Sequence, residues 1–266
     1  MGICKNCKNK FEGNYCNSCG EKVVHDADFS LKKLMSQAFD SITHLDSKLF
    51  KTLKLLFFYP GKLSMQFVDG IRIPYMKPFQ IFIISNIMFF FIFSNEDLFK
   101  YPSSYFFIEN FEGIRVMNKV RQIVQNSDFT ESEVAKLYDV KSTNLAKGLL
   151  IFLIPLIALI SKLFNPKQKL EFGKHIIFST HFLTFVLLLF GIVGIMTLVI
   201  PENFEKKLII IPLGILIYFY YSTALKNFYH NSNTLSFIKG IFGILSIFIL
   251  VELYKIFVSA LTLYTL

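Results

Sequence analysis

Five long runs of apolar residues constrain this chain more than any other feature of its sequence. A helix needs about 20 mostly apolar residues to cross the hydrocarbon core of a bilayer. Hydrophobic residues make up 53% of the chain, only 18% are charged, and the mean hydropathy is +0.48. A soluble core cannot bury that much apolar surface, so we predict an all-α membrane protein with a five-helix transmembrane bundle. The predicted spans cover about residues 78–94, 145–164, 176–200, 208–225 and 237–263.

The charges between these runs predict which side of the membrane each connection faces. The residues before Pro78 carry 12 Lys and Arg against 7 Asp and Glu, whereas residues 95–144 carry 6 against 8. Residues 161–175 are again basic, residues 201–207 are neutral, and two lysines flank residues 227–236. Basic connections stay in the cytoplasm. We therefore predict a multi-pass protein of the bacterial inner membrane with a cytoplasmic N-terminus, a periplasmic or external C-terminus and an external helical loop over residues 95–144.

The net charge of +9 also raises the question of nucleic-acid binding. A nucleic-acid surface normally interleaves dense basic residues with aromatic ones, and only Lys5, Lys8, Lys10 and Lys22 support such a surface here. Cytoplasmic loops that face anionic headgroups explain the charge more simply. We expect membrane lipids as partners and do not expect nucleic acid.

All four cysteines lie in two Cys-x-x-Cys pairs near the N-terminus, at Cys4, Cys7, Cys16 and Cys19. On the reducing cytoplasmic side, paired thiolates at this spacing favour a tetrahedral metal site over disulfides. Four thiolates leave no open coordination position, so the sequence predicts a structural zinc ribbon over residues 1–24. A rubredoxin-like iron site and four unrelated free cysteines are the alternatives.

Residues 25–77 are predicted to form cytoplasmic amphipathic helices. In the second of them, one face is apolar and the opposite face carries Lys48, Lys51 and Lys54. Such a helix lies in the headgroup layer or packs on the protein's own bundle. Asp69 and Arg72 are expected to pair across the Gly70 turn, and Asp69, Arg72 and Lys77 are candidates for interfacial anchoring or partner binding.

Two segments resemble a bacterial membrane family known as domain of unknown function 3667: "CKNC…YCNSCGEK", residues 4–22, and "KTLKLLFFYPGKLSMQFVDGIRIPYMKPFQIFIISN", residues 51–86. The matching positions are Thr52, Leu53, Pro60, Gly61, Gly70, Arg72 and Pro78. The resemblance covers about the first third of the chain, and implies an N-terminal zinc ribbon and several spans but no activity. A more distant likeness to Yip-type five-span membrane proteins rests on the number of spans alone.

Four polar residues inside predicted spans are candidate functional residues, because burying them in lipid is costly. Glu252 and Lys255 lie three residues apart on one helix face, so we expect a local ion pair, with a proton or ion relay as the alternative. His181 is expected to be hydrogen-bonded within the bundle. Asn86 is expected to bond to a neighbouring helix.

The sequence contains no catalytic motif that we recognise: no His-Glu-x-x-His, no Gly-x-Ser-x-Gly and no phosphate-binding glycine loop. The first interpretation is therefore a non-enzymatic scaffold or adaptor, whose cytoplasmic zinc ribbon engages a protein partner or the membrane surface. The alternative is a small transporter or lipid-handling protein. That alternative requires a cavity that reaches Glu252, Lys255 or His181.

Overall fold

The computed structural model describes residues 2–3, 8–18, 47–92, 98–106, 121–122, 124–125, 129–166, 170–197 and 207–266. The chain divides into two compact units, Met1–Phe50 and Lys51–Leu266, which we describe separately. In the first unit, β1 (Gly2–Ile3) pairs antiparallel with β2 (Lys10–Phe11), with Gly2 opposite Phe11. The two strands form a small hairpin.

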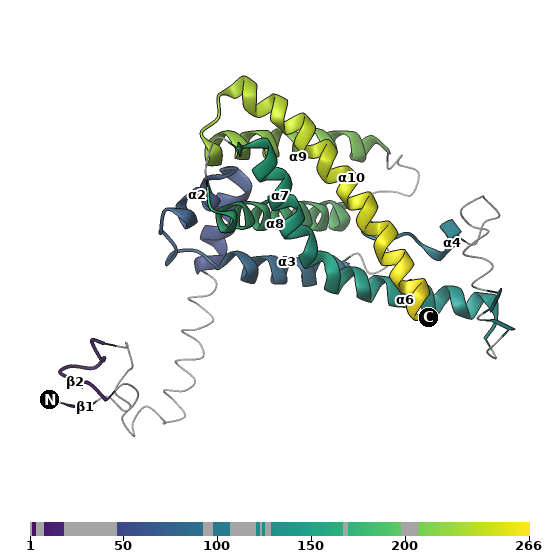
Figure 1. Ribbon diagram of the computed structural model, residues 1–266, viewed down its shortest axis with the longest axis horizontal. Coiled ribbons are helices and arrows are strands. Elements are labelled where there is room, and N and C mark those ends of the chain that lie inside the picture. Colours follow the sequence, from purple (N-terminus) through teal and green to yellow (C-terminus); the bar gives the residue numbers. More distant parts are fainter. Residues whose placement is uncertain are drawn as a thin grey trace. The chain divides into compact units, whose positions relative to one another are not determined.

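The second unit is built of helices (Figure 1). Most of a helix over residues 47–58 belongs to it. The labelled helices are α2 (Lys62–Val68), α3 (Pro78–Ile92), α4 (Ser103–Phe106), α6 (Glu131–Leu149), the 3₁₀ turn η2 (Leu150–Phe152), α7 (Leu153–Phe164), α8 (Phe172–Thr197), α9 (Lys207–Tyr229) and α10 (Asn233–Thr265). Helix α8 packs against α3 and α7, and α10 packs against α9, α7 and α6.

Four helical stretches in the described part of the chain are long and apolar enough to cross a membrane. They are Glu131–Phe164, Phe172–Met196, Ile209–Tyr229 and Asn233–Thr265. The first predicted span corresponds to α3, whose 15 described residues are shorter than a span needs. The apolar helices therefore indicate a multi-pass membrane protein, and the fifth span stays a prediction.

The helical stretch that contains the second predicted span, Glu131–Phe164, begins well before Leu145, inside the region assigned to the external loop. The side chain of Thr130 accepts from the backbone N–H of Glu133, and the Glu133 carboxylate accepts from the backbone N–H of Thr130 at 2.8 Å. This capping box satisfies free N–H groups of the first turn, so α6 begins at Glu131. A run of apolar residues alone marks the part of a helix that lipid can cover, and does not mark where the helix begins.

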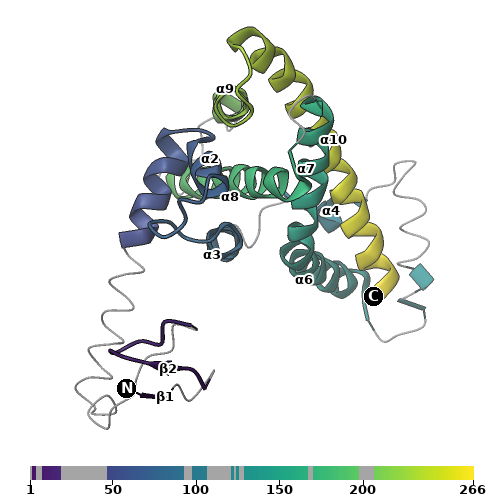
Figure 2. The ribbon, with the colours of Figure 1, turned by 60° about the vertical axis from the view of Figure 1, so that its left-hand side comes forward.

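Helix α7 leaves α6 at a sharp angle across the η2 turn (Figures 1 and 2). Pro155 lies just beyond this turn, and a proline lacks an N–H and its ring clashes with the carbonyl four residues earlier. Side chains from two other helices donate to carbonyls in the last turn of α6: Tyr254 to Ala146 at 2.7 Å and Asn86 to Lys147 at 3.1 Å. These donors are what a bent helix needs in lipid, where water is absent.

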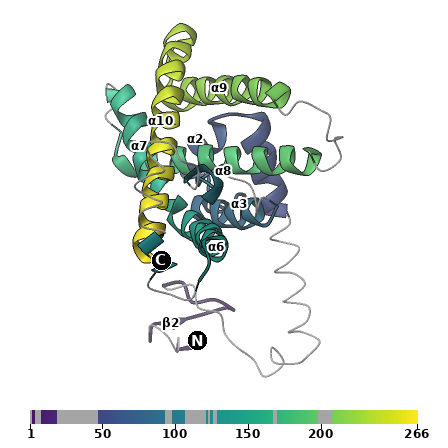
Figure 3. The ribbon, with the colours of Figure 1, turned by 90° about the vertical axis from the view of Figure 1, so that its right-hand side faces the viewer.

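Helices α9 and α10 approach closely, and Figure 3 shows α10 running from its contact with α9 to α6 near its C-terminal end. A Cβ atom added at Gly243 would lie 2.6 Å from a ring carbon of Tyr221, and one at Gly240 would overlap Ser222. The absence of a side chain at both glycines thus allows the close packing of these two helices.

The amphipathic segment before α3 packs on the bundle itself, which is the second of the two arrangements expected for it. Thr52 and Leu56 are buried, and the ring of Phe57 lies edge-on to Phe185 of α8 at 5.5 Å. Thr52 also accepts a hydrogen bond from the backbone N–H of Met76 at 2.9 Å. The lysines of the helix over residues 47–58 remain on its exposed side.

Candidate ligand-binding cavity in the helix bundle

A cavity of about 300 Å³ lies among α7, α8, α9 and α10. Thirteen of its lining residues are apolar or glycine and two are charged. The lining consists of Leu98, Phe99, Ile157, Phe182, Leu183, Val186, Phe190, Gly214, Ile217, Ile244, Ile247, Phe248, Val251, Glu252 and Lys255. This volume lies at the lower end of the range of ligand pockets, and the predominance of apolar lining with few polar groups is typical of them.

The charged residues of the cavity form the ion pair that their spacing predicts. Lys255 Nζ lies 2.9 Å from Glu252 Oε1, one turn apart on α10. The hydroxyl of Tyr101 donates to Glu252 Oε2 at 2.6 Å, and Lys255 Nζ lies 5.4 Å from the centroid of the Tyr101 ring. Both Glu252 oxygens are therefore occupied, and the two opposite charges lower the cost of placing either one beside apolar residues.

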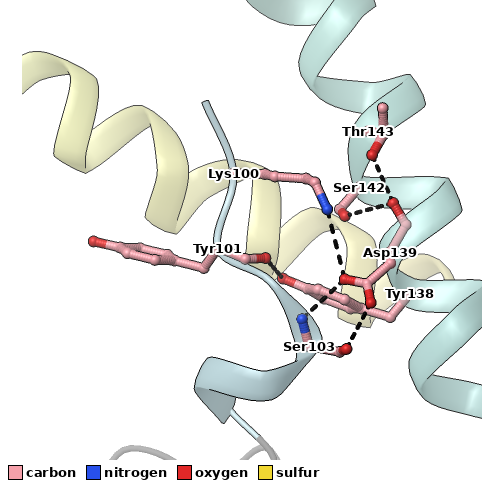
Figure 4. Close-up of polar contacts among 7 residues, drawn as sticks. All are labelled: Lys100, Tyr101, Ser103, Tyr138, Asp139, Ser142 and Thr143. Carbon is pink, nitrogen blue, oxygen red and sulfur yellow. Dashed lines mark hydrogen bonds and ion pairs between the residues drawn. The ribbon is translucent and has the colours of Figure 1, made fainter. Parts of the chain in front are cut away.

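Tyr101 is held in place by a cluster of polar contacts centred on Asp139 of α6 (Figure 4). Asp139 accepts from the backbone N–H of Ser103 at 2.9 Å and from the Ser103 hydroxyl at 2.6 Å. Lys100 Nζ lies 3.6 Å from the same carboxylate. The hydroxyl of Tyr138 donates to the carbonyl of Tyr101 at 3.2 Å. Contacts on both sides of Tyr101 thus fix its backbone.

The chain that leads into the Asp139 cluster forms part of the cavity lining. Leu98 and Phe99 line the cavity and directly precede Lys100, which is buried. Phe99 packs edge-on against Phe89 of α3 at 5.5 Å. The segment over residues 98–106 is therefore bound to α6 through Asp139, to α3 through Phe99 and to α10 through Tyr101. This segment therefore contributes apolar side chains, Leu98 and Phe99, to the cavity lining, and its Tyr101 contacts the charged residue Glu252.

The structure does not bring His181 to this cavity, although its neighbours Phe182 and Leu183 line it. His181 is buried and faces α2, where its Nδ1 lies 2.9 Å from the hydroxyl oxygen of Ser64. The ring of Phe67 lies edge-on to it at 6.3 Å. Its Nε2 has no hydrogen-bond partner among the described residues. His181 therefore links α2 to α8, in line with the expected hydrogen bond within the bundle.

The other predicted residues lie in separate places. Asn86 bonds to a neighbouring helix as expected, at the bend of α6, and not to the cavity. Arg72 does not pair with Asp69 within residues 47–92; its Nε donates instead to the carbonyl of Phe67 at 3.0 Å, and its guanidinium lies over the Phe67 ring. Asp69, Arg72 and Lys77 are all exposed.

Of the four cysteines, only Cys16 lies within the described residues, and it is buried. Cys4, Cys7 and Cys19 lie outside them, so the predicted zinc site is not tested, and the described residues alone contain no group of three potential metal ligands. The amide of Asn9 donates to the Ser18 hydroxyl at 2.8 Å. This bond joins the segment that follows the first cysteine pair to the segment inside the second pair.

Sequence reasoning missed Tyr101 and Asp139. Both lie in the region assigned to the external loop, and neither belongs to a motif. Asp139 was one acidic residue among several, and Tyr101 lies 151 positions from the carboxylate that it contacts. No motif or spacing in "KLYDVKST", residues 136–143, distinguishes this part of α6 from an ordinary exposed helix.

Comparison with known proteins identifies one segment. Residues 46–90 match a family model described as Protein of unknown function (DUF3667). The matched segment contains the helix over residues 47–58, α2 and most of α3, and it includes the motif positions from Thr52 to Pro78. The family resemblance is thus confirmed for this segment, while the ribbon and the likeness to Yip-type proteins stay predictions. No curated protein and no solved structure matches the chain.

Proposed function

We propose that this chain is an inner-membrane protein that binds a lipid-like amphiphile in the cavity among α7, α8, α9 and α10. The observation that carries the proposal is the union of an apolar cavity with a charged pair, Glu252 and Lys255, in its lining. A hydrocarbon chain suits the apolar lining. An ionic or zwitterionic headgroup suits the two charges, which remain partly exposed.

The cavity favours this function over the scaffold role as the primary one. The alternative derived from the sequence required a cavity that reaches Glu252, Lys255 or His181, and the cavity is lined by the first two. An apolar cavity of about 150 Å³ is already large enough to bind benzene, and this one is about twice as large. A membrane supplies amphiphiles at high local concentration, so a bundle with such a cavity is well placed to hold one.

Long-range hydrogen bonds support the proposed sidedness. Connections assigned to the cytoplasm meet each other: Asn227 donates to the carbonyl of Pro60 and Asn231 donates to Asn165, both at 2.8 Å. Segments assigned to the outside also meet, because Lys141 donates to the carbonyl of Thr265 near the C-terminus. The packing thus groups the connections as the charge counts do, and this supports the proposed cytoplasmic N-terminus and external C-terminus, which five spans would produce.

The proposal can be tested by introducing a larger side chain at a lining position where the structure has space for one. A Cβ atom added at Gly214, which lines the cavity, meets nothing within 4 Å. Gly214→Leu in the purified full-length protein should therefore fold without a clash, and it is expected to narrow the cavity at the part of the lining that Gly214 forms. Native mass spectrometry from detergent should show co-purified lipid on the unaltered protein and its loss from Gly214→Leu. Gly148→Leu is the matched control, because Gly148 also has open space around it and lies outside the cavity.

The charged pair is tested separately with Glu252→Gln/Lys255→Gln, which removes both charges and leaves neither ion alone. Binding of a charged amphiphile should weaken, while binding of an uncharged one of the same chain length should persist. Equal lipid retention by Gly214→Leu and Gly148→Leu would overturn the proposal. So would an absence of bound lipid from the unaltered protein.

We propose an adaptor role for the N-terminal unit as a second function. The supporting observations are the β1–β2 hairpin, the burial of Cys16 and the bond between Asn9 and Ser18. Four thiolates at these positions would hold a zinc ion, which would supply folding energy to a segment too short for a core. Co-purification of a protein partner that depends on residues 1–24 would support the role, and an unchanged set of partners after their deletion would contradict it.

A further inference from the structure

A second pocket lies among the connections that are assigned to the cytoplasm, where the helix over residues 47–58 ends and α9 ends. Its volume is about 680 Å³, and its lining includes Phe58, Tyr59, Lys62, Lys226, Asn227 and His230. It shares no lining residue with the cavity that contains Glu252 and Lys255. The two sites are therefore separate.

The charge of this pocket is positive. The side chains of Lys62 and Lys226 are exposed, His230 is exposed beside them, and no acidic residue lines the pocket. The C-terminal ends of two helices lie here and carry partial negative charge, equivalent to roughly half a charge each. The carbonyl of Pro60, at one of these ends, already accepts the amide of Asn227. Two full lysine charges therefore outweigh the helix ends.

The walls of the pocket are fixed by close packing between the Pro60-Gly61 turn and α9. Gly61 adopts a φ of +78°, and a Cβ atom there would lie 2.6 Å from the carbonyl oxygen of Ala224. Asn227, one turn after Ala224, donates to Pro60 at 2.8 Å. Lys62 and Lys226 therefore extend from two backbones that are held against each other, and do not depend on a mobile loop.

We infer that this pocket binds a phosphate group, and that its source is the headgroup of an anionic lipid. Basic pockets between membrane helices on the cytoplasmic side recognise such headgroups. Phe58 and Tyr59 line the same pocket and expose 76% and 46% of their surface, and aromatic side chains of this kind sit at the level of the headgroups. The lysines would bind the phosphate while the rings contact the glycerol and upper chain of the lipid.

The experiment measures binding of phosphatidylglycerol to the detergent-solubilised full chain by native mass spectrometry, with diacylglycerol as the phosphate-free arm. Lys62→Gln/Lys226→Gln is expected to weaken phosphatidylglycerol binding roughly 30-fold, since a lysine near anionic lipid contributes about fivefold. Binding of diacylglycerol should not change. Lys51→Gln/Lys54→Gln is the matched control, because it removes two exposed lysines that lie outside the pocket.

The outcomes separate this site from the cavity and from diffuse surface charge. Gly214→Leu should leave the lysine-dependent binding intact, so failure of the cavity proposal does not decide this one. Displacement of the lipid by millimolar inorganic phosphate would support a phosphate site but overturn the lipid as its source, and no displacement would support the lipid. The inference is wrong if Lys62→Gln/Lys226→Gln binds normally or if Lys51→Gln/Lys54→Gln loses as much.

Discussion

The hydroxyl of Tyr220 on α9 donates to the carbonyl oxygen of Leu56 at 2.6 Å. In a continuous helix the N–H four residues on would occupy this carbonyl, but that residue is Pro60, which has no N–H. The tyrosine supplies the missing donor from 164 positions away in the sequence. The segment that matches the family model is thus bonded to a helix that lies outside the match.

Tyr220→Phe should destabilise the protein by about 1–2 kcal/mol, because a buried carbonyl loses a donor that water cannot replace. The measurement is the midpoint of thermal unfolding in detergent. Tyr218→Phe serves as the control, since the Tyr218 hydroxyl bonds at 3.2 Å in an exposed position. Equal midpoints for the two variants would show that the bond to Leu56 contributes nothing.

Gly61→Ala should be more harmful than Gly70→Ala. Both glycines have positive φ, +78° and +97°, which costs a residue with a Cβ about 1–2 kcal/mol. At Gly61 the added Cβ atom would also lie 2.6 Å from the carbonyl oxygen of Ala224, and such a clash adds about 1–3 kcal/mol, whereas a Cβ atom at Gly70 meets nothing within 4 Å. Monodispersity and the unfolding midpoint after purification measure the difference. A Gly61→Ala variant as stable as Gly70→Ala would contradict the close packing on Ala224.

Asp139→Ala should release the segment over residues 98–106 from α6. The change removes two acceptors for Ser103 and the ion-pair partner of Lys100, which is only 6% exposed. Trypsin should then cleave after Lys100 at least several times faster than in the unaltered protein, as followed by mass spectrometry. Glu131→Ala on the same helix is the control, because Glu131 is exposed and remote from the cluster. Unchanged cleavage would mean that the cluster does not hold the segment.

Zinc analysis should find one zinc ion per chain, because four thiolates complete a tetrahedral site. Cys16→Ser removes one ligand and is expected to lower the zinc content severalfold. The bundle should keep its unfolding midpoint in this variant, since Met1–Phe50 forms a separate unit. Elemental analysis of the same sample checks both points, and iron in place of zinc would favour the rubredoxin-like alternative.

Features that depend on neighbours within one or two turns were readable from the sequence. The apolar runs indicated the helices, and the spacing of Glu252 and Lys255 indicated their ion pair. In each case the residues involved lie close together along one helix. Side-chain direction in a helix is regular enough that such contacts follow from spacing alone.

Features that join distant parts of the chain were decided by tertiary structure. No pattern in the sequence pointed to the bond between Tyr101 and Glu252 or told which helix Asn86 would bond to, and the sequence suggested an ion pair between Asp69 and Arg72 that the fold does not make. Hydrogen-bond partners at such separations depend on crossing angles and on which helix faces meet. The crossing angles and the contacting faces depend on how all the side chains pack together, so no local pattern of residues specifies them.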